Sequence, residues 1–201
     1  AERLGGAPGT WTVREVGDGN LNLVFIVEGP AGGLVVKQAL PYVRLVGESW
    51  PLPLDRAWYE HRALVTHARF APERLPEVLH FDAERAAVVM EWLTPHIILR
   101  KGLIQGRRYP QVAAHLASFM ARTLFHTSDL AMPAAEKRPL QAAFASNVEL
   151  CRITEELIFT DPYRVAPLNR WTSPQLDDVA ASFRSDAALK VAIQELIWGF
   201  L

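Results

Sequence analysis

Residues 17–27 read GDGNLNLVFIV, a cluster of turn-forming residues followed by a run of strand formers. An Asp-Gly turn between strand-like runs is among the strongest local signals for a β-hairpin. WTVREV at 11–16 precedes this turn, and LVVKQAL at 34–40 follows a second glycine-rich turn. We therefore predict three antiparallel strands. The pattern leaves open whether the loop at 17–22 binds a phosphate group or is only a tight turn.

The next part of the chain predicts a loop, a helix and two more strands. Residues 39–56 contain three prolines and no stable period, which is typical of a loop. Asp55 stands at an N-cap position before DRAWYEHRALVTHARF at 55–70, whose apolar residues share one helical face. EVLHFD at 77–82 and AAVVMEWL at 86–93 are strand-like. The predicted order is β-β-β-α-β-β.

Helical periodicity dominates the rest of the chain. Apolar residues repeat at helical spacing in 110–128, and we predict further helices over 141–158 and 175–198. The change from strand to helix patterns near Glu91 to Pro95 predicts a boundary between an N-terminal lobe, 1–94, and a mainly helical lobe, 95–201. The predicted class is α+β, with an antiparallel sheet and one helix in the first lobe.

Composition excludes several classes of function. The chain has 201 residues, half of them hydrophobic, with 21 Lys and Arg against 22 Asp and Glu, so it lacks the basic surplus of a nucleic-acid or acidic-membrane partner. No apolar run approaches the roughly 20 residues of a membrane span. The single cysteine, Cys151, allows no disulfide within the chain and fits a cytoplasmic setting; its apolar neighbours predict a core position.

Familiar catalytic motifs are also missing from the sequence. It contains no P-loop pattern, no H-E-x-x-H and no paired cysteines, so neither a P-loop site nor a zinc site is expected. Gly47-Glu48-Ser49-Trp50-Pro51 begins like a nucleophile elbow but lacks the closing glycine.

Several weaker features follow one another in an order that suits ATP. Gly17-x-Gly19-x-x-Asn22 lies in the predicted hairpin, where backbone N–H groups and the Asn22 amide could donate to phosphates. Lys37 ends an apolar strand, where a charged side chain is costly unless it has a partner or a function. Its ammonium group could reach the α- and β-phosphates. Glu60 on the next helix could pair with Lys37. By default each feature is only a turn or a solvated charge, but their common order favours a kinase small lobe.

Four stretches of the sequence resemble the 5-methylthioribose kinase family, within the aminoglycoside-phosphotransferase-like kinases of the protein-kinase-like superfamily. They are GDGNLNLVF at 17–25, VVKQALPYVRLVGESWPLPLDR at 35–56, TLFHTSDL at 123–130 and ITEELIFTDPY at 153–163. The resemblance runs from about Val16 to the C-terminus, and the second stretch contains its most specific part.

The resemblance implies ATP- and Mg²⁺-dependent phosphorylation of the 1-hydroxyl of 5-methylthioribose in methionine salvage, by a homodimer. It implies that Asn22 contacts ATP, that Lys37 binds its phosphates and that Glu60 orients Lys37. The backbone of the hinge would face adenine, and a tryptophan-bearing loop would lie near the sugar. The hinge residues are Glu91, Trp92 and Leu93, and the loop residues are Glu48, Ser49 and Trp50. Relatives often have an acidic residue where this chain has Trp92.

The chain departs from the family in one respect. Phosphoryl transfer needs a catalytic-loop Asp and an acidic metal ligand, yet no H-G-D, H-R-D or D-F-G motif is present, and His126–Asp129 does not substitute. We therefore expect an N-terminal portion of a longer kinase, inactive alone. Two alternatives stay open: another kinase of the superfamily, acting on an aminoglycoside, choline or homoserine, and a non-catalytic nucleotide-binding module.

Overall fold

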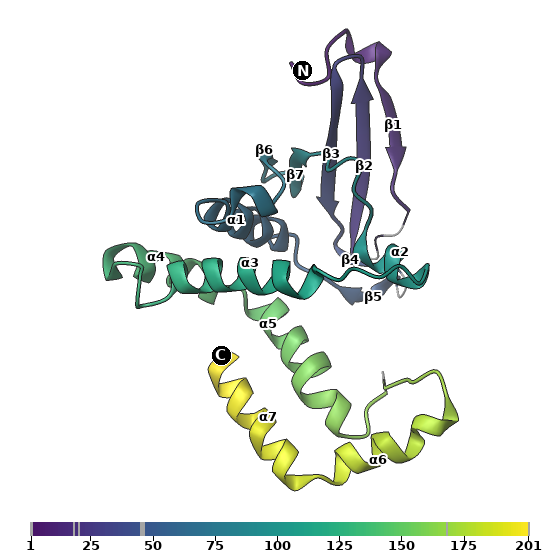
Figure 1. Ribbon diagram of the computed structural model, residues 1–201, viewed down its shortest axis with the longest axis vertical. Helices are drawn as coiled ribbons and strands as arrows, with labels where there is room; N and C mark the ends of the chain where they lie inside the picture. The colour runs from purple at the N-terminus through teal and green to yellow at the C-terminus, as the bar shows by residue number, and fades with distance from the viewer. Residues whose placement is uncertain (1, 18, 20, 45–46, 168, 201) are drawn as a thin grey trace. The chain divides into compact units, whose positions relative to one another are not determined.

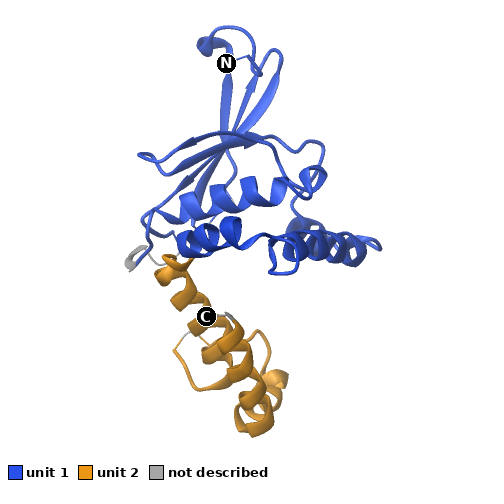
Figure 2. Ribbon diagram, turned by 90° about the vertical axis from the view of Figure 1, so that its left-hand side faces the viewer, with its two compact units in different colours: residues 1–144 blue, residues 145–201 orange. Residues whose placement is uncertain are grey.

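The computed structural model describes residues 2–17, 19, 21–44, 47–167 and 169–200. The chain forms two compact units, 1–144 and 145–201, which Figure 2 shows in blue and orange. This division by contacts falls at a different place from the predicted lobe boundary at residue 94, which stays a prediction. Among the helices in the described ranges, none combines the length and the apolar character needed to cross a membrane.

A five-stranded antiparallel sheet forms the centre of the first unit, which confirms the predicted α+β class (Figure 1). Its strands lie in the order β1-β2-β3-β7-β6. Their bounds are Thr12–Glu15 for β1, Asn22–Gly29 for β2, Gly32–Ala39 for β3, Ala87–Glu91 for β7 and Val78–Asp82 for β6. The β-hairpin expected from the Asp-Gly turn is present, since β1 and β2 pair antiparallel, and β2 and β3 form the second hairpin.

The predicted loop over 39–56 is wrong in part, because it contains a second, two-stranded sheet. Strands β4 (Tyr42–Val43) and β5 (Gly47–Pro51) pair antiparallel there. The prolines do not prevent this pairing, because Pro41 precedes β4 and Pro51 ends β5, at positions where a strand can lack an N–H donor. The Leu52 N–H donates to the Pro41 carbonyl at 2.9 Å, which joins the residue after β5 to the residue before β4.

Helix α1 (Arg56–Ala68) packs against β3, β6 and β7 of the large sheet (Figure 1). The contact buries Ala57 on the helix, next to Ala39 and Ala86 and the partly buried ring of Phe81. His61 stacks on Phe81 with ring centroids 4.5 Å apart, and burial lowers the pKa of His61. Asp55 occupies the N-cap position, but its side chain makes no capping hydrogen bond, so that part of the prediction is wrong.

Three further helices complete the first unit, α2 (Leu99–Ile104), α3 (Val112–Thr127) and α4 (Ala134–Ala145). Helix α3 confirms the helix predicted over 110–128. Aromatic contacts join it to the C-terminal end of α1. His126 of α3 stacks on Phe70 with centroids 4.8 Å apart, and Phe119 meets His67 edge to face at 5.8 Å.

The second unit is helical, but its helices are shorter than predicted. In place of a helix over 141–158, α4 ends at residue 145 and α5 (Val148–Thr154) continues into a π-helical turn, Glu155–Thr160. The helix expected over 175–198 is divided into α6 (Asp177–Ser185) and α7 (Ala187–Phe200). Both breaks fall at a Ser-Asn or Ser-Asp pair, and such side chains compete with helical backbone bonding.

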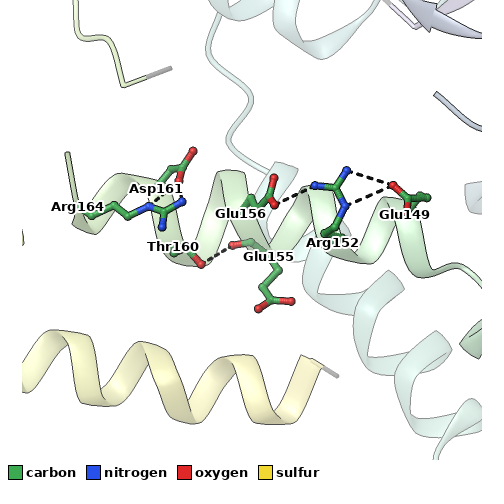
Figure 3. A network of polar contacts seen from close by, with 7 residues as sticks. All are labelled: Glu149, Arg152, Glu155, Glu156, Thr160, Asp161 and Arg164. Atoms are coloured by element: carbon green, nitrogen blue, oxygen red, sulfur yellow. Dashed lines mark hydrogen bonds and ion pairs between the residues drawn. The ribbon is translucent and has the colours of Figure 1, made fainter. Parts of the chain in front are cut away.

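Polar contacts along α5 and the π-helical turn are shown in Figure 3. Arg152 pairs with Glu149 at 3.1 Å and with Glu156 at 2.9 Å, on both sides of one helical face. The Thr160 hydroxyl donates to the Glu155 carbonyl at 3.1 Å, across the wider π turn. Cys151, expected in the core, is only half-buried.

The N-terminal arm allows a direct test of the packing around the β2–β3 turn. Leu4 is 3% exposed, and a Cβ added at Gly29 would lie 2.3 Å from the Leu4 carbonyl oxygen. We expect Gly29→Ala to lower the free energy of unfolding by about 1–3 kcal/mol, because backbone must shift to admit the methyl group. Urea denaturation measures this. Gly9→Ala is the control, since no atom lies within 4 Å of its Cβ position; equal midpoints would contradict the packing of the arm.

Candidate functional site

An ion pair between the sheet and α1 is the centre of the candidate site. The Lys37 ammonium on β3 lies 2.5 Å from a carboxylate oxygen of Glu60 on α1, and the two side chains are 27% and 34% exposed. The pairing predicted between these residues is therefore present. A pair this accessible to water contributes about 1 kcal/mol or less to stability. Its main effect is to hold the ammonium group in one place on the sheet.

Apolar side chains share the sheet face of Lys37. Val24 on β2 lies opposite Lys37, and Val35 is two residues before it, opposite Met90 on β7. Residues two apart on a strand and directly opposite across a pair point to the same face, so Val24, Val35 and Met90 form an apolar wall beside the ammonium group. Sequence reasoning missed this wall, although counting alternate residues from Lys37 would have found Val35.

The loop before β2 is tight at Gly19. A Cβ added there would lie 2.7 Å from the Asn22 carbonyl oxygen, whereas one at Gly17 would meet no atom within 4 Å. The Val16 N–H donates to the Val24 carbonyl at 2.8 Å and closes the hairpin below the loop. The loop is thus at least a turn that requires glycine at position 19.

Asn22, the first residue of β2, receives a hydrogen bond from a buried arginine. Arg56 is 8% exposed at the start of α1, and its guanidinium donates to Asn22 Oδ1 at 3.2 Å and to the Leu21 carbonyl. It also donates to the Pro53 carbonyl at 3.1 Å. Burial lowers the pKa of Arg56, an effect opposed by the charges of Glu60 and Asp55.

Sequence reasoning missed Arg56, although a signal was available. Arg56 is the first residue of α1, where the helix dipole disfavours a cation. A positive charge at the wrong end of a helix indicates that other groups bind it. The acceptors on Leu21 and Asn22 are more than thirty residues away in the chain, so the sequence alone could flag the arginine but not name its partners.

The predicted hinge follows the last strand directly. Glu91 ends β7, where its N–H donates to the Glu77 carbonyl at 2.8 Å. The Trp92 ring lies over Gly33, whose added Cβ would be 2.5 Å from the ring, and the Arg14 guanidinium lies 5.7 Å from the ring centroid. Leu93 is 44% exposed. The Trp92 side chain therefore packs on the sheet.

Two further expectations, the tryptophan-bearing loop near the sugar and the binding of Mg²⁺, are not tested by the described side chains. Glu48, Ser49 and Trp50 lie within β5, which pairs with β4 through Gly47 and Pro51, and their side chains lie outside the described part of the chain. Within the described ranges, no three His, Cys, Asp or Glu side chains are grouped so that they could hold a metal ion. No Mg²⁺ ligand is therefore assigned among the described residues.

A cavity of about 640 Å³ also lies in the first unit, but it contains none of the predicted site residues. Its wall is mainly apolar and includes Leu75, Tyr109 and Phe119. Lys37, the cation that the sequence predicts for a phosphate site, does not line this cavity and pairs with Glu60 elsewhere in the first unit.

Comparison with known proteins gives relatives that share one name. The chain is 52% identical over 197 residues to methylthioribose kinase 2 of Oryza sativa subsp. japonica, which covers 98% of this chain and 46% of the relative. It is 52% identical over 186 residues to methylthioribose kinase of Escherichia coli O45:K1 (strain S88 / ExPEC), covering 92% and 44%. The enzyme of Pectobacterium carotovorum subsp. carotovorum (strain PC1) is 48% identical over 206 residues, covering 100% and 51%. No family model matches the chain.

These comparisons confirm the resemblance seen in the sequence. This chain is homologous over nearly its whole length to methylthioribose kinases, which are small-molecule kinases. It spans about half the length of the relatives that it matches.

The Lys37–Glu60 pair can be tested by a double-mutant cycle on stability. With Lys37→Met, Glu60→Gln and the double variant, we expect a coupling of about 0.5–1 kcal/mol in the free energy of unfolding, reduced at high salt. Urea denaturation measures the coupling. The matched control is Arg14 with Glu28, a longer and more exposed pair at 3.5 Å, for which the coupling should be close to zero. Equal coupling in the two pairs would contradict a special position for Lys37.

Proposed function

We propose that this chain, a homologue of methylthioribose kinases, forms the ATP-binding part of a kinase that phosphorylates the 1-hydroxyl of 5-methylthioribose. The supporting observation is the Lys37–Glu60 ion pair at the edge of an apolar sheet face, close to a glycine-requiring turn. The reaction would serve methionine salvage, and a cytoplasmic homodimer is part of the same proposal.

The phosphates of ATP would bind at the end of the site formed by the loop and Lys37. The Lys37 ammonium supplies a point charge for the α- and β-phosphates, and Glu60 holds it there. Gly17 and Gly19 let backbone N–H groups approach the phosphates closely. The Asn22 amide adds a side-chain donor.

The adenine ring would lie against the apolar wall. Val24, Val35 and Met90 provide that surface, next to Lys37 on the same sheet face. The hinge backbone at Glu91 and Leu93 would supply polar contacts to the base. Because these contacts use backbone groups, Trp92 in place of an acidic residue changes them little.

Phosphoryl transfer needs two further groups, an Asp that positions the attacking hydroxyl and acidic ligands for Mg²⁺. We assign neither to this chain, because its sequence has no H-G-D, H-R-D or D-F-G motif and no metal-binding group occurs among its described residues. Mg²⁺, when bound with ATP, would neutralise phosphate charge. The loop with Glu48, Ser49 and Trp50 is the proposed neighbour of the sugar.

Nucleotide affinity tests the proposed roles of Lys37 and Asn22. The 201-residue chain should bind ATP in isothermal titration calorimetry, and Lys37→Met should weaken binding about tenfold or more, because the phosphates lose a cation. Asn22→Ala should weaken binding about fivefold with less effect on the unfolding midpoint. Lys101→Met, at an exposed position of α2, is the control. If stability falls and ATP affinity does not, the loop is only a turn.

A kinase assay tests the assignment of the catalytic groups. We expect no phosphorylation of methylthioribose by the 201-residue chain with ATP and Mg²⁺, because no residue in it is assigned to hydroxyl positioning. Turnover would contradict this expectation. A chain extended to the length of the relatives should be stabilised by methylthioribose in thermal-shift measurements. Stabilisation by choline, homoserine or an aminoglycoside instead would favour another kinase of the superfamily.

A further inference from the structure

The positive charge of Arg56 is disfavoured for two reasons, its burial and its position at the start of a helix. It is 8% exposed, and it begins α1, where the free backbone N–H groups of the helix are already partly positive. A buried charge persists only when hydrogen bonds replace its water. The acceptors here are the carbonyls of Leu21 and Pro53 and the side-chain oxygen of Asn22.

These acceptors come from two different loops. Leu21 and Asn22 lie at the exit of the glycine-containing loop, and Pro53 lies between β5 and α1. One guanidinium therefore fixes both segments to the start of the helix. Glu60 lies one helical turn further along α1, where it pairs with Lys37. The nucleotide loop and the ion pair thus share one rigid support.

The bond from Arg56 also determines which end of the Asn22 amide can donate. A carboxamide has one oxygen that accepts and one NH₂ group that donates. Because Asn22 Oδ1 accepts from Arg56 at 3.2 Å, the NH₂ group is the end left for a phosphate oxygen. Without Arg56 the amide could rotate about its terminal bond and present its oxygen instead, which a phosphate would repel.

We propose that Arg56 is a positioning residue for the nucleotide: it orients the Asn22 amide as a phosphate donor and holds the loop exit against the helix that carries Glu60. This role rests on the proposed function, since it requires that phosphate binds at the loop. Arg56 itself does not contact the nucleotide. It acts through Asn22, and that dependence distinguishes it from a residue that only stabilises the fold.

A double-mutant cycle on ATP affinity tests this dependence in the 201-residue chain. Arg56→Lys keeps the charge but loses the guanidinium fork, and we expect it to weaken ATP binding about fivefold. Asn22→Ala should have a similar effect. The double variant should bind no more weakly than the weaker single variant, because Arg56 has no amide left to orient. The control is Arg62→Lys, on the exposed side of the same helix, which should leave affinity unchanged.

Asn22→Asp tests the same orientation without altering Arg56. The carboxylate still accepts from the guanidinium, so stability should be kept or raised, but it has no proton to donate. We expect ATP binding to fall about tenfold or more. This variant keeps the test valid if Arg56→Lys does not fold. In the nucleotide-free protein, the side-chain amide resonances of Asn22 should move in Arg56→Lys and stay in place in Arg62→Lys.

The outcomes separate this inference from the proposed function. If the unaltered chain does not bind ATP, the proposed function fails and the role of Arg56 fails with it. If the chain binds ATP and the effects of Arg56→Lys and Asn22→Ala simply add, only the positioning role is overturned. Loss of stability in Arg56→Lys with unchanged ATP affinity would make Arg56 a purely structural residue. Unchanged ATP affinity in Asn22→Asp would overturn the orientation.

Discussion

The need to satisfy a cation on an apolar sheet face organises the first unit. Alternation along β3 places Lys37 on the face that α1 covers, beside Val24 and Val35. A charge in that position has to meet an opposite charge or water. Glu60 supplies the opposite charge from the helix. The ion pair therefore links α1 to β3 at one point. The apolar contacts around Ala57 supply most of the buried surface between the helix and the sheet.

The same physical constraint recurs at the start of α1. Arg56 is more deeply buried than Lys37, and its hydrogen bonds go to uncharged oxygen atoms from two loops, while Glu60 and Asp55 act on it by charge alone. Hydrogen bonds to carbonyl groups fix geometry more strictly than a charge–charge contact, because they depend on direction as well as distance. The loops around Asn22 and Pro53 are consequently held by direction-dependent bonds, whereas Lys37 is held mainly by attraction to one carboxylate.

Local sequence signals account for much of the fold. The turn and strand patterns were enough to predict five strands, and the apolar helical face of residues 55–70 predicted α1, because these signals act between near neighbours. Helix ends were less predictable. The Ser-Asn and Ser-Asp pairs that separate the helices after residues 145 and 185 were read as helix interior, since apolar periodicity continues across them. The β4–β5 pairing was missed because prolines normally indicate a loop, although here they stand at strand ends.

In the candidate site, too, features marked by neighbouring residues were predicted, and the long-range contacts of Arg56 were not. Lys37 and Glu60 could be predicted as a pair because each stands out in its own element, a charge after an apolar strand and an acid on the next helix. The partners of Arg56 depend on tertiary folding and carry no mark in the sequence.

Trp92 illustrates how a departure from a family pattern can leave a site intact. Its ring fills the space above Gly33 on β3, where any side chain would collide, and Arg14 reaches the ring from β1, on the far side of β2. The residue type at position 92 is thus set by packing on the sheet. The backbone on either side, at Glu91 and Leu93, is free of that constraint on side-chain identity. A hinge that recognises a base through backbone groups can therefore accept tryptophan in place of an acid, because the two requirements fall on different atoms.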